Sequence, residues 1–383
     1  MSAAGFLKKL LGGADVVWVP LGELTTVKTG QSVNKNLIAA NPGPYPVINS
    51  GREPLGFIDK WNTDDDPIGV TTRGAGVGSI TWQEGKYYRG NLNYAVSVLP
   101  NVSLAVRFLY HLLLEMQSEI HSLCTFDGIP ALNAGKLKEL AIPIPCPDDP
   151  QKSLAIQGEI VRILDSFTEL TTELTTELTQ RKKQYNHYRE QLLTFDDGEV
   201  EWKALGEVVG IQRGRRLVRS QLEETGKFAV FQNSMKPLGF YHDSNVEADT
   251  TFVICAGAAG EIGYSASKFW AADDVYFFQT PNGILSKYVY HWLLTQRSKI
   301  SSQVRRASIP RLSKSVLELL EFPIPCPDDP QKSLAIQGDI VRILDSFTEL
   351  TAELTAELTQ REKQYAYYRD QLLNFPKPDA KTT

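Results

Sequence analysis

One block of sequence occurs twice in this chain, and this repeat limits the possible folds more than any local motif. Residues 143–158, PIPCPDDPQKSLAIQG, return letter for letter as residues 323–338, at an offset of 180 residues. The match runs on to Phe195 and Phe375, and only nine of the 54 aligned positions that start at Ile142 and Phe322 differ. A repeat of this length predicts a structural unit that occurs twice, so we expect a pseudo-twofold internal repeat.

Each copy predicts one long helix. Pro150 and Pro330 suit the first helical position, and the apolar residues that follow are spaced by three and four residues, which is the pattern of a heptad seam. The expected seam comprises Ile160, Ile163, Phe167, Leu170, Leu174 and Leu178 in the first copy, and Ile340, Ile343, Phe347, Leu350, Leu354 and Leu358 in the second. The two helices are expected to form a hairpin that joins two domains.

A tetrapeptide repeat lies in the middle of each expected helix. It reads TELTTELTTELT over residues 168–179 and TELTAELTAELT over residues 348–359. Four extra residues within a heptad pattern form a stutter, which locally unwinds a coiled coil. Because threonine is a mediocre helix former, burial of the leucine side chains must keep this segment helical.

The composition bounds the class of protein. A chain of 383 residues that is 42% apolar is long enough for two to three domains. No stretch is apolar enough to span a membrane, and the N-terminal run is too short and too charged for a secretory signal. The cysteines, Cys124, Cys146, Cys255 and Cys326, lack metal-binding spacing and predict neither a metal site nor a disulfide framework. These features favour a cytoplasmic protein, and the net charge of −5 restricts any nucleic-acid site to a local patch.

The repeats divide the chain into alternating helices and domains. We expect a short N-terminal helix at residues 1–15, a first domain at 16–149, a first long helix at 150–195, a second domain at 196–329, a second long helix at 330–375 and a tail at 376–383. The N-terminal run FLKKLL at residues 6–11 parallels YREQLL at residues 188–193, and a tryptophan, Trp18 or Trp202, follows each. We interpret this run as the tail of a third copy of the helix.

The two domains are weakly similar to each other. VPLGELTTVKTG at residues 19–30 corresponds to KALGEVVGIQRG at 203–214, and EPLGF at 53–57 corresponds to KPLGF at 236–240. Short β-branched and aromatic runs bounded by Gly, Asn and Pro predict strands and turns. A helix and an Ile-Pro step then close each domain, so the expected fold class is α+β.

The search for catalytic motifs finds none. NPGPY at residues 41–45 lacks the adjacent prolines of the Asn-Pro-Pro-Tyr tetrapeptide of amino-methyltransferases, and GAGVG at residues 74–78 leads into a strand-like run, which is the wrong context for a dinucleotide fingerprint. His111 and His291 occupy the same place on amphipathic helices, and we interpret both as structural. We therefore expect no catalytic residue, no metal site and no cofactor on this chain.

Basic and amide side chains cluster in the expected loops of both domains. Arginine offers two donors to guanine, and Asn or Gln pairs similarly with adenine, so such loops can read the major groove while other cations contact phosphates. The candidate DNA-binding residues are Lys28, Gln31, Asn34, Lys35, Arg52, Arg73, Lys86 and Arg89 in the first domain, and Arg213, Arg215, Arg216, Arg219, Lys236, Arg305, Arg306 and Arg311 in the second.

This organisation resembles the specificity subunit of a type I restriction-modification system. The resemblance rests on two divergent domains that alternate with two near-identical helices, on the TAEL-type tetrapeptide, and on the PLGE and PIP landmarks. It covers essentially the whole chain. It is closest to the subgroup that carries tetrapeptide repeats in the spacer helix.

The resemblance implies a division of labour. Two globular target-recognition domains each read one half of a bipartite site on double-stranded DNA, and the two helices form an antiparallel coiled coil that sets the distance. Two modification (methyltransferase) subunits dock on the repeated parts, and restriction (motor-nuclease) subunits join for cleavage. S-adenosylmethionine, ATP and Mg then belong to these partners, and this chain is a non-catalytic specificity subunit.

Two other classes of function are open to a chain of this kind. One is a non-enzymatic coiled-coil adaptor or a transcription-related DNA-binding protein. The other is a self-sufficient methyltransferase, which the missing motifs disfavour. Near-identity of the helices and divergence of the domains favour the recognition scaffold, because two like surfaces suit two like partners while unlike domains recognise unlike targets.

Overall fold

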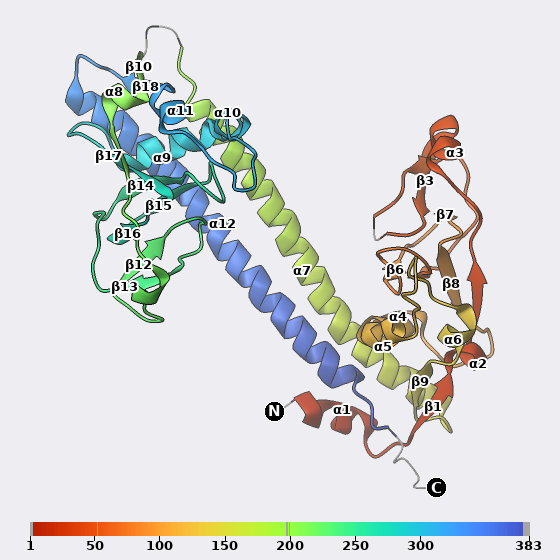
Figure 1. Ribbon diagram of the computed structural model, residues 1–383. Helices are drawn as coiled ribbons and strands as arrows, with labels where there is room; N and C mark the ends of the chain where they lie inside the picture. The colour runs from red at the N-terminus through yellow and green to blue at the C-terminus, as the bar shows by residue number, and fades with distance from the viewer. Residues whose placement is uncertain (1–2, 52, 197, 199, 378–383) are drawn as a thin grey trace. The chain divides into compact units, whose positions relative to one another are not determined.

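The computed structural model describes residues 3–51, 53–196, 198 and 200–377. The chain divides into two compact units. Unit 1 comprises Met1–Leu174 with Glu357–Thr383, and unit 2 comprises Thr175–Ala356. Each unit therefore contains one globular domain together with parts of both long helices (Figure 1).

Domain 1, residues 16–145, combines small sheets with short helices. Its strands are β1 (Val16–Pro20), β2 (Thr25–Thr29), β3 (Pro42–Ile48), β4 (Phe57–Ile58), β5 (Ile68–Thr71), β6 (Ile80–Trp82), β7 (Tyr88–Arg89), β8 (Asn93–Val98) and β9 (Ala141–Pro145). Its helices are α2 (Leu21–Leu24), α3 (Lys35–Ala40), α4 (Val106–Glu115), α5 (Gln117–Ser122) and α6 (Ala134–Lys138), and helix α1 (Ala3–Leu11) precedes the domain.

Domain 2, residues 200–325, repeats this series. Its strands are β10 (Val200–Ala204), β11 (Gly210–Arg213), β12 (Phe228–Phe231), β13 (Gly239–Tyr241), β14 (Thr250–Ile254), β15 (Ile262–Ser265), β16 (Phe269–Ala271), β17 (Val275–Gln279) and β18 (Glu321–Pro325). Its helices are α8 (Leu205–Val208), the 3-10 turn η1 (Arg219–Gln221), α9 (Ser286–Thr295), α10 (Arg297–Ser302) and α11 (Lys314–Glu318).

The two domains have the same strand topology. A four-stranded sheet has the order β2-β8-β5-β6 in domain 1 and β11-β17-β14-β15 in domain 2; the three-stranded sheets β4-β3-β7 and β13-β12-β16 and the two-stranded sheets β1-β9 and β10-β18 also correspond. The register agrees as well, because Trp18 faces Pro143 and Trp202 faces Pro323. The predicted α+β class and internal repeat are confirmed.

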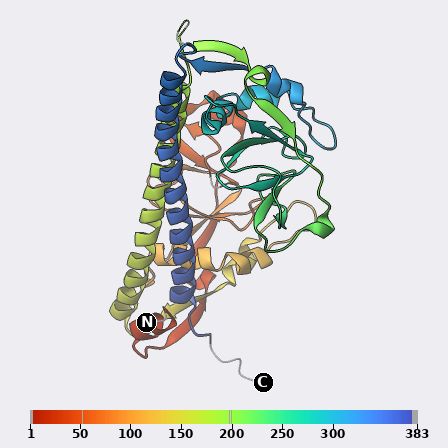
Figure 2. The same cartoon turned by 90° about the vertical axis from the view of Figure 1, so that its left-hand side faces the viewer.

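The repeat forms two long helices, α7 (Pro150–Leu192) and α12 (Pro330–Leu373), each continuous along its length (Figure 2). An aspartate caps each N-terminus directly before the proline. The Asp149 carboxylate accepts the amide of Lys152 at 3.0 Å, and the Asp329 carboxylate accepts the amide of Lys332 at 3.1 Å. Both helices therefore start where the sequence places a capping aspartate and a proline.

Aromatic contacts show the direction of the helix pair. In unit 1, Phe167 of α7 stacks on Tyr368 of α12 with ring centroids 5.2 Å apart, and in unit 2, Tyr188 of α7 stacks on Phe347 of α12 at 5.3 Å. Partner numbers fall along α12 as they rise along α7, so the helices are antiparallel, as predicted. In the tetrapeptide segment, Leu174 and Leu178 are only 9% and 7% exposed, which keeps this threonine-rich stretch helical.

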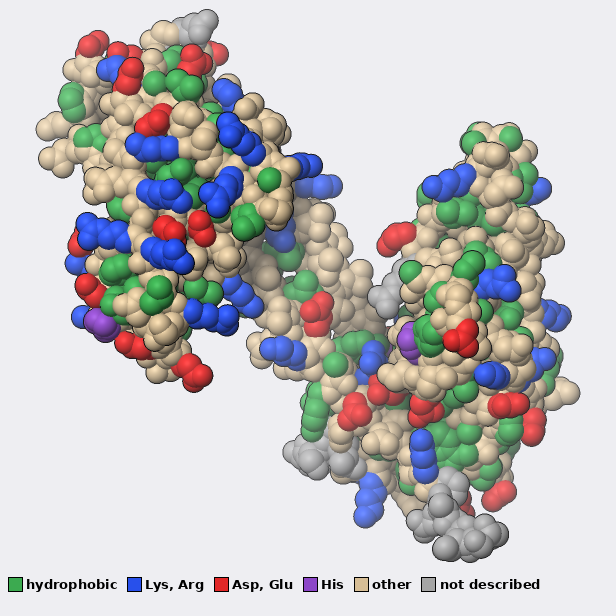
Figure 3. All heavy atoms as spheres, viewed as in Figure 1, with side chains coloured by type: hydrophobic (Ala, Val, Ile, Leu, Met, Phe, Trp, Pro, Cys, Tyr) green, Lys and Arg blue, Asp and Glu red, His purple; other side chains and the backbone are tan. Residues whose placement is uncertain are grey.

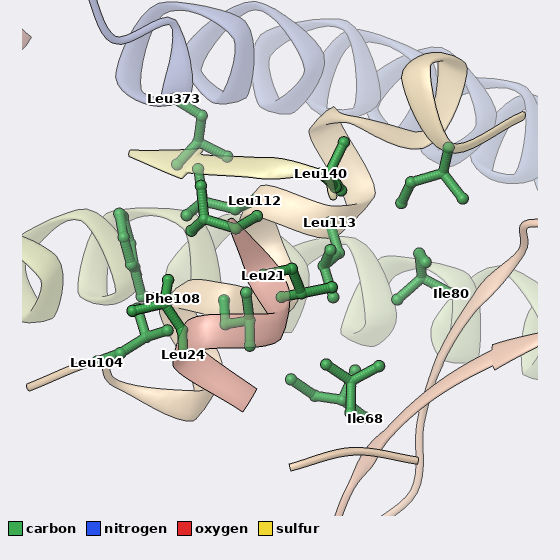
Figure 4. Packing of buried hydrophobic residues seen from close by; sticks show 14 of the residues in the cluster. Leu21, Leu24, Ile68, Ile80, Leu104, Phe108, Leu112, Leu113, Leu140 and Leu373 are labelled. Atoms are coloured by element: carbon green, nitrogen blue, oxygen red, sulfur yellow. The ribbon is translucent and has the colours of Figure 1, made fainter. Parts of the chain in front are cut away.

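The core of unit 1 lies where the four-stranded sheet, α2 and α4 meet the start of α7. Leu21, Ile68 and Phe108 pack together there (Figure 4). Ile160 of α7 belongs to the same cluster, and Ile340 of α12 occupies the corresponding place in the core of unit 2. These two isoleucines, predicted in the coiled-coil seam, therefore lie in the domain cores.

Helix α1 is an addition to unit 1. Its residues Leu7 and Leu11 join the core beside Leu373, the last residue of α12, and Phe375, which follows that helix. In unit 2 the corresponding residue is Leu193, which directly follows α7. In each unit, the C-terminal end of one long helix therefore packs against the domain core. Helix α1, interpreted from the sequence as the tail of a third helix copy, packs in unit 1 in addition to the end of α12.

Position 89 shows that the two domains fill the same interior differently. Arg89 in β7 is equivalent to Ala271 in β16, because each exchanges a pair of hydrogen bonds with an asparagine side chain, Asn62 or Asn245. The Arg89 side chain is 3% exposed and donates to the carbonyl oxygens of Ile68 at 3.0 Å and Tyr94 at 3.1 Å and to Asn93 Oδ1 at 2.6 Å, with Asp66 at 3.8 Å. A buried cation whose two terminal nitrogen atoms donate to these acceptors holds this part of domain 1 together.

Domain 2 fills the corresponding region with aromatic rings. Phe252, Phe269 and Phe277 form a buried cluster with Ala271 and Val275. The ring centroids of Phe252 and Phe269 are 5.2 Å apart. The same backbone therefore encloses a polar network in one domain and an apolar cluster in the other.

Replacing Arg89 with Ala is expected to lower the free energy of unfolding of domain 1 by about 3–5 kcal/mol, because buried acceptors and Asp66 lose their charged donor. Urea denaturation followed by tryptophan fluorescence measures the change. The matched control is Arg215→Ala in domain 2, an exposed arginine whose loss is expected to cost less than about 0.5 kcal/mol. Equally small effects from both variants would show that Arg89 does not support the domain.

Candidate nucleic-acid interface

Two clefts lie at equivalent places in the two domains. Each is bordered by the first strand of the four-stranded sheet, by the loop that carries the paired asparagine and by the last strand of the three-stranded sheet. The cleft of domain 1 has a volume of about 320 Å³ and is lined by Lys28, Thr29, Gly30, Gln31, Asn62, Thr63, Asp64, Asp66, Arg89 and Ala95. The cleft of domain 2 has a volume of about 380 Å³ and is lined by Gln212, Arg213, Arg215, Asp243, Ser244, Asn245, Trp270, Phe277 and Gln279.

The backbone frame of the two clefts is the same. A Cβ atom on Gly30 would lie 2.3 Å from the carbonyl oxygen of Gly90, and one on Gly214 would lie 2.2 Å from that of Ala272. Only glycine allows the chain after β2 or β11 to approach the small sheet so closely. The paired hydrogen bonds of the asparagine loop hold the opposite wall at the same distance in both domains.

The side chains that line the clefts differ. Lys28 in β2 corresponds to Gln212 in β11, and Gln31 corresponds to Arg215. Gln212 Nε2 also donates to Gln279 Oε1 at 2.6 Å. Because the donors and acceptors on a protein surface decide which base edges it can pair with, two clefts with one frame and unlike linings can recognise different bases.

Most of the predicted DNA-binding residues are exposed. They are Lys28, Gln31, Asn34, Lys35, Arg73 and Lys86 in domain 1, and Arg213, Arg215, Arg216, Arg219, Lys236, Arg305, Arg306 and Arg311 in domain 2. Lys28 and Gln31 come together in one cleft, and Arg213 and Arg215 in the other. Lys and Arg side chains gather on the displayed face of domain 2 (Figure 3). Their contact with DNA stays a prediction.

Several of these exposed residues also make contacts within the protein. The Gln31 Oε1 atom accepts a hydrogen bond from the Tyr88 hydroxyl at 3.4 Å. The Asn34 side chain caps α3 by accepting an amide hydrogen bond at 2.8 Å. The Lys86 ammonium lies 4.7 Å from the centre of the Trp61 ring. The Arg213 Nε atom donates to the carbonyl oxygen of Asp273 at 2.6 Å. These contacts orient the side chains without burying them.

Arg89 requires a correction. The sequence places it among the DNA-binding residues, but its guanidinium is buried beneath the cleft and its donors are used by domain 1 itself. Its role is structural, because exposing it to a ligand would break these bonds. Arg52, another predicted DNA-binding residue, lies outside the described residues.

Each domain docks on the start of a long helix through a buried glutamine. In unit 1, Gln157 Oε1 accepts the amide of Ala105 at 2.8 Å, and its Nε2 atom donates to the carbonyl oxygen of Ser103 at 3.0 Å. In unit 2, Gln337 makes the same two bonds to the segment before α9, each at 2.9 Å. Both glutamines are 0% exposed, so these bonds decide how each domain sits on its helix.

A buried histidine makes the second link at each junction. His111 Nε2 lies 2.8 Å from Asp165 Oδ1 in unit 1, and His291 Nε2 lies 3.0 Å from Asp345 Oδ1 in unit 2. Both histidines are 0% exposed. Burial lowers the pKa of both imidazoles, and the neighbouring aspartates offset this only in part. Each neutral ring therefore donates its Nε2 hydrogen to the carboxylate of the helix.

This architecture matches a known protein family. The family model described as the type I restriction modification DNA specificity domain matches residues 14–183 and again residues 198–361. The chain belongs to this family. Each match joins one specificity domain to the long helix that follows it, and this is the unit that the internal repeat outlines.

Relatives in this specificity family match along nearly the whole chain. The EcoR124I/EcoR124II type I restriction enzyme specificity subunit of Escherichia coli is 32% identical over 414 residues, which cover 99% of this chain and 99% of the relative. A putative type I restriction enzyme specificity subunit of Haemophilus influenzae is 29% identical and covers 97% of this chain and 98% of its own length. The crystal structure of a type I restriction-modification system S subunit from M. genitalium, 23% identical, superposes with a TM-score of 0.75 over 96% of this chain and 97% of that chain.

Among the described residues, no group of three or more His, Cys, Asp or Glu side chains is arranged to hold a metal ion. No helix in the described part of the chain is both long and apolar enough to cross a membrane.

The docking residues of this specificity-family chain escape a search for seams and motifs. Ser153, Gln157, Leu164 and Asp165 lie on the face of α7 that meets the domain, and the second copy repeats them. Ser153, Gln157 and Leu164 are spaced by four and seven residues, with Asp165 directly after Leu164. This stripe beside the leucine seam is the signal that could have found them. From the sequence alone, a polar residue in this stripe cannot be distinguished from a solvent-exposed polar residue, because its hydrogen-bond partners lie in the domain.

Stability is expected to fall as the pH drops below about 6.5, the ordinary pKa of histidine. Since burial lowers the pKa of His111 and His291 in the folded state, the unfolded chain binds more protons in this range, and unfolding becomes easier with each proton. Arg107 and Arg369 face His111, and Lys287 and Arg189 face His291, which adds to the effect.

Urea denaturation at pH 7.5, 6.5 and 5.5 measures this loss. The double variant His111→Gln and His291→Gln keeps a donor at each place and cannot titrate, so its stability is expected to change less between pH 6.5 and 5.5. An identical pH dependence of the wild type and the variant would contradict the assignment.

Proposed function

We propose that this chain reads a bipartite DNA site, with one half-site recognised by each domain. The observation that carries the proposal is the contrast between the two clefts, which share a backbone frame but differ in the side chains that line them. A shared frame presents both domains to DNA in the same way, while unlike side chains select unlike bases. Exposed lysines and arginines around the clefts supply the contacts to phosphate that fix the register.

The two long helices are proposed to set the distance between the half-sites. Each helix belongs partly to unit 1 and partly to unit 2, and the tetrapeptide segments lie where the chain passes from one unit to the other. The number of tetrapeptides therefore decides the length of helix between the two docking points. This is the role that the resemblance to specificity subunits with repeats of this kind implies.

Two modification subunits are proposed to dock on the repeated parts, and restriction subunits to join the full complex. Part of the identity between the helices is explained within the chain, because the docking residues must be the same in both units. Other identical residues point outward in both copies, among them Gln151 and Lys152 in α7 and Gln331 and Lys332 in α12. These exposed and repeated side chains suit two copies of one partner.

We further propose that the chain is non-catalytic, acts in the cytoplasm and binds no cofactor of its own. S-adenosylmethionine, ATP and Mg are then bound by the partner subunits. Isothermal titration of the purified chain with S-adenosylmethionine is expected to give no heat of binding, and the same titration of the co-expressed modification complex is the positive control. Binding by the chain alone would contradict this part of the proposal.

Exchanging residues 16–149 for another recognition domain is expected to change one half of the methylated site only. The second half is kept, because domain 2 docks on α12 through its own glutamine and histidine. Sequencing of methylated positions in DNA modified by the assembled complex measures the outcome. A change in both halves would show that the domains do not read independently.

Inserting one TTEL after Leu178 is expected to lengthen the gap between half-sites by about one base pair. Four residues add roughly 6 Å of helix and about 1.1 turns, which leaves the leucine face nearly in phase. At 3.4 Å per base pair, about 6 Å corresponds to roughly one to two base pairs. Both half-site sequences are expected to stay the same when the methylated sites are mapped.

The matched control inserts two residues at the same place. Two residues turn the helix by roughly 200° and move the seam away from its partner, so this variant is expected to lose activity. A four-residue insertion that leaves the gap unchanged, or that changes the bases read, would refute the role of the helices as a spacer.

A further inference from the structure

Three short segments are joined by isolated β-bridges next to the Ile-Pro step, and both domains have these bridges. In domain 1, Arg73 pairs with Ala131, and in domain 2, Ala256 pairs with Arg311. Each pair contains one arginine and one alanine. The arginine comes from one strand in domain 1 and from the opposite strand in domain 2.

Hydrogen bonds around the bridge establish that the two places are equivalent. Gly74, with φ of 90°, donates its amide hydrogen to the carbonyl oxygen of Pro130 at 3.0 Å, and Gly257, with φ of 83°, donates to that of Pro310 at 3.1 Å. The residues before Arg73 and Ala256 also correspond. The carbonyl oxygen of Thr72 accepts the amide hydrogen of Leu132 at 2.9 Å, and that of Cys255 accepts the amide hydrogen of Leu312 at 2.8 Å. The backbone is therefore the same, while the arginine of the pair has changed strand and the third residue of the bridge is Thr125 in domain 1 and Arg305 in domain 2.

The exchange preserves the position of the charge. Residues paired across antiparallel strands project from the same side and their Cβ atoms lie about 4.5–5.5 Å apart, a distance that the long arginine side chain readily spans. Arg73 and Arg311 are both exposed, and within the described part of the chain neither side chain makes an ion pair or hydrogen bond. The neighbouring loop also projects into solvent in both domains, with Ile129 73% and Ile309 53% exposed.

Arg73 and Arg311 place a positive charge at the same position in two domains whose other surface residues differ. Such a shared charge suits a feature of DNA that is the same in both half-sites. Bases differ between half-sites, whereas the phosphate backbone is common to both. The guanidinium group pairs with phosphate through two parallel hydrogen bonds. We infer that Arg73 and Arg311 are equivalent phosphate anchors, which position each domain on the DNA without reading its sequence; this inference rests on the proposed function.

The test uses the specificity chain assembled with its modification subunits and a duplex that carries the methylated site. Dissociation constants are measured at several salt concentrations for Arg73→Ala, Arg73→Gln and Arg311→Ala. Each variant is expected to weaken binding about eightfold at 0.1 M salt and to lower the salt slope by about 0.9, the effect of one phosphate contact. Methylation mapping is expected to return the same two half-sites.

A strand-exchange variant is the matched control. Arg73→Ala with Ala131→Arg moves the arginine to the partner strand, as domain 2 has it; the reverse exchange is not used in domain 2, because Ala256 is only 4% exposed. The exchange is expected to restore the wild-type affinity to within about twofold and to recover the salt slope. A lost side chain of purely structural importance would not be rescued in this way.

Three results would overturn the inference. They are unchanged affinity in all single variants, a change in the bases of a half-site, and loss of subunit assembly while DNA affinity is kept, which would make the arginines a protein contact. Failure of the wild-type complex to bind the duplex would instead count against the proposed function, so the two failures are distinguishable. Since Arg73→Gln keeps a polar, hydrogen-bonding side chain but removes the charge, a defect shared by Arg73→Ala and Arg73→Gln reports the charged guanidinium group.

Discussion

The buried glutamine at each junction between domain and helix is the contact on which the rest of a unit depends. Gln157 and Gln337 are fully buried, and an unpaired amide in such a place costs about 1–3 kcal/mol for each group left unsatisfied. Both the donor and the acceptor of each glutamine are paired with backbone groups of the domain. A domain that slid along or rotated on its helix would break these bonds, so one seating is strongly favoured over its neighbours.

This junction explains why some residues are identical in the two copies of the repeat while others differ between the two domains. The helix residues that dock a domain are the same in α7 and α12, because both domains present the same backbone segment to them. Side chains far from the junction, such as those lining the clefts, have no such partner on the helix. Near-identical helices and divergent domains are therefore compatible with a single architecture, and recognition can change while the seating of the domain is preserved.

The interior of the domains shows how much change the architecture tolerates. Arg89 with its carbonyl acceptors in domain 1 and the phenylalanine cluster around Ala271 in domain 2 fill equivalent places under one sheet topology. A buried guanidinium needs acceptors and a counter-charge around it, which Ile68, Tyr94, Asn93 and Asp66 supply to Arg89, whereas aromatic rings need only volume and shape. The backbone frame survives because Gly30 and Gly214 and the paired asparagines fix the approach of the strands whichever filling is used.

The sequence by itself determined the internal repeat, the two long helices and the fold class, because these depend on periodicity and on residues close together in the chain. The antiparallel direction of the helices was implied by the family resemblance, and Ile160 and Ile340 of the expected seam lie in the domain cores. The sequence did not determine that Arg89 is buried while Arg73 and Arg311 are exposed, since all three are arginines in strand-and-turn segments. It also missed Gln157 and Asp165, whose partners lie more than 50 residues away. Burial and partnership are decided by non-local strand pairing and helix docking, and only the tertiary structure brings those distant residues together.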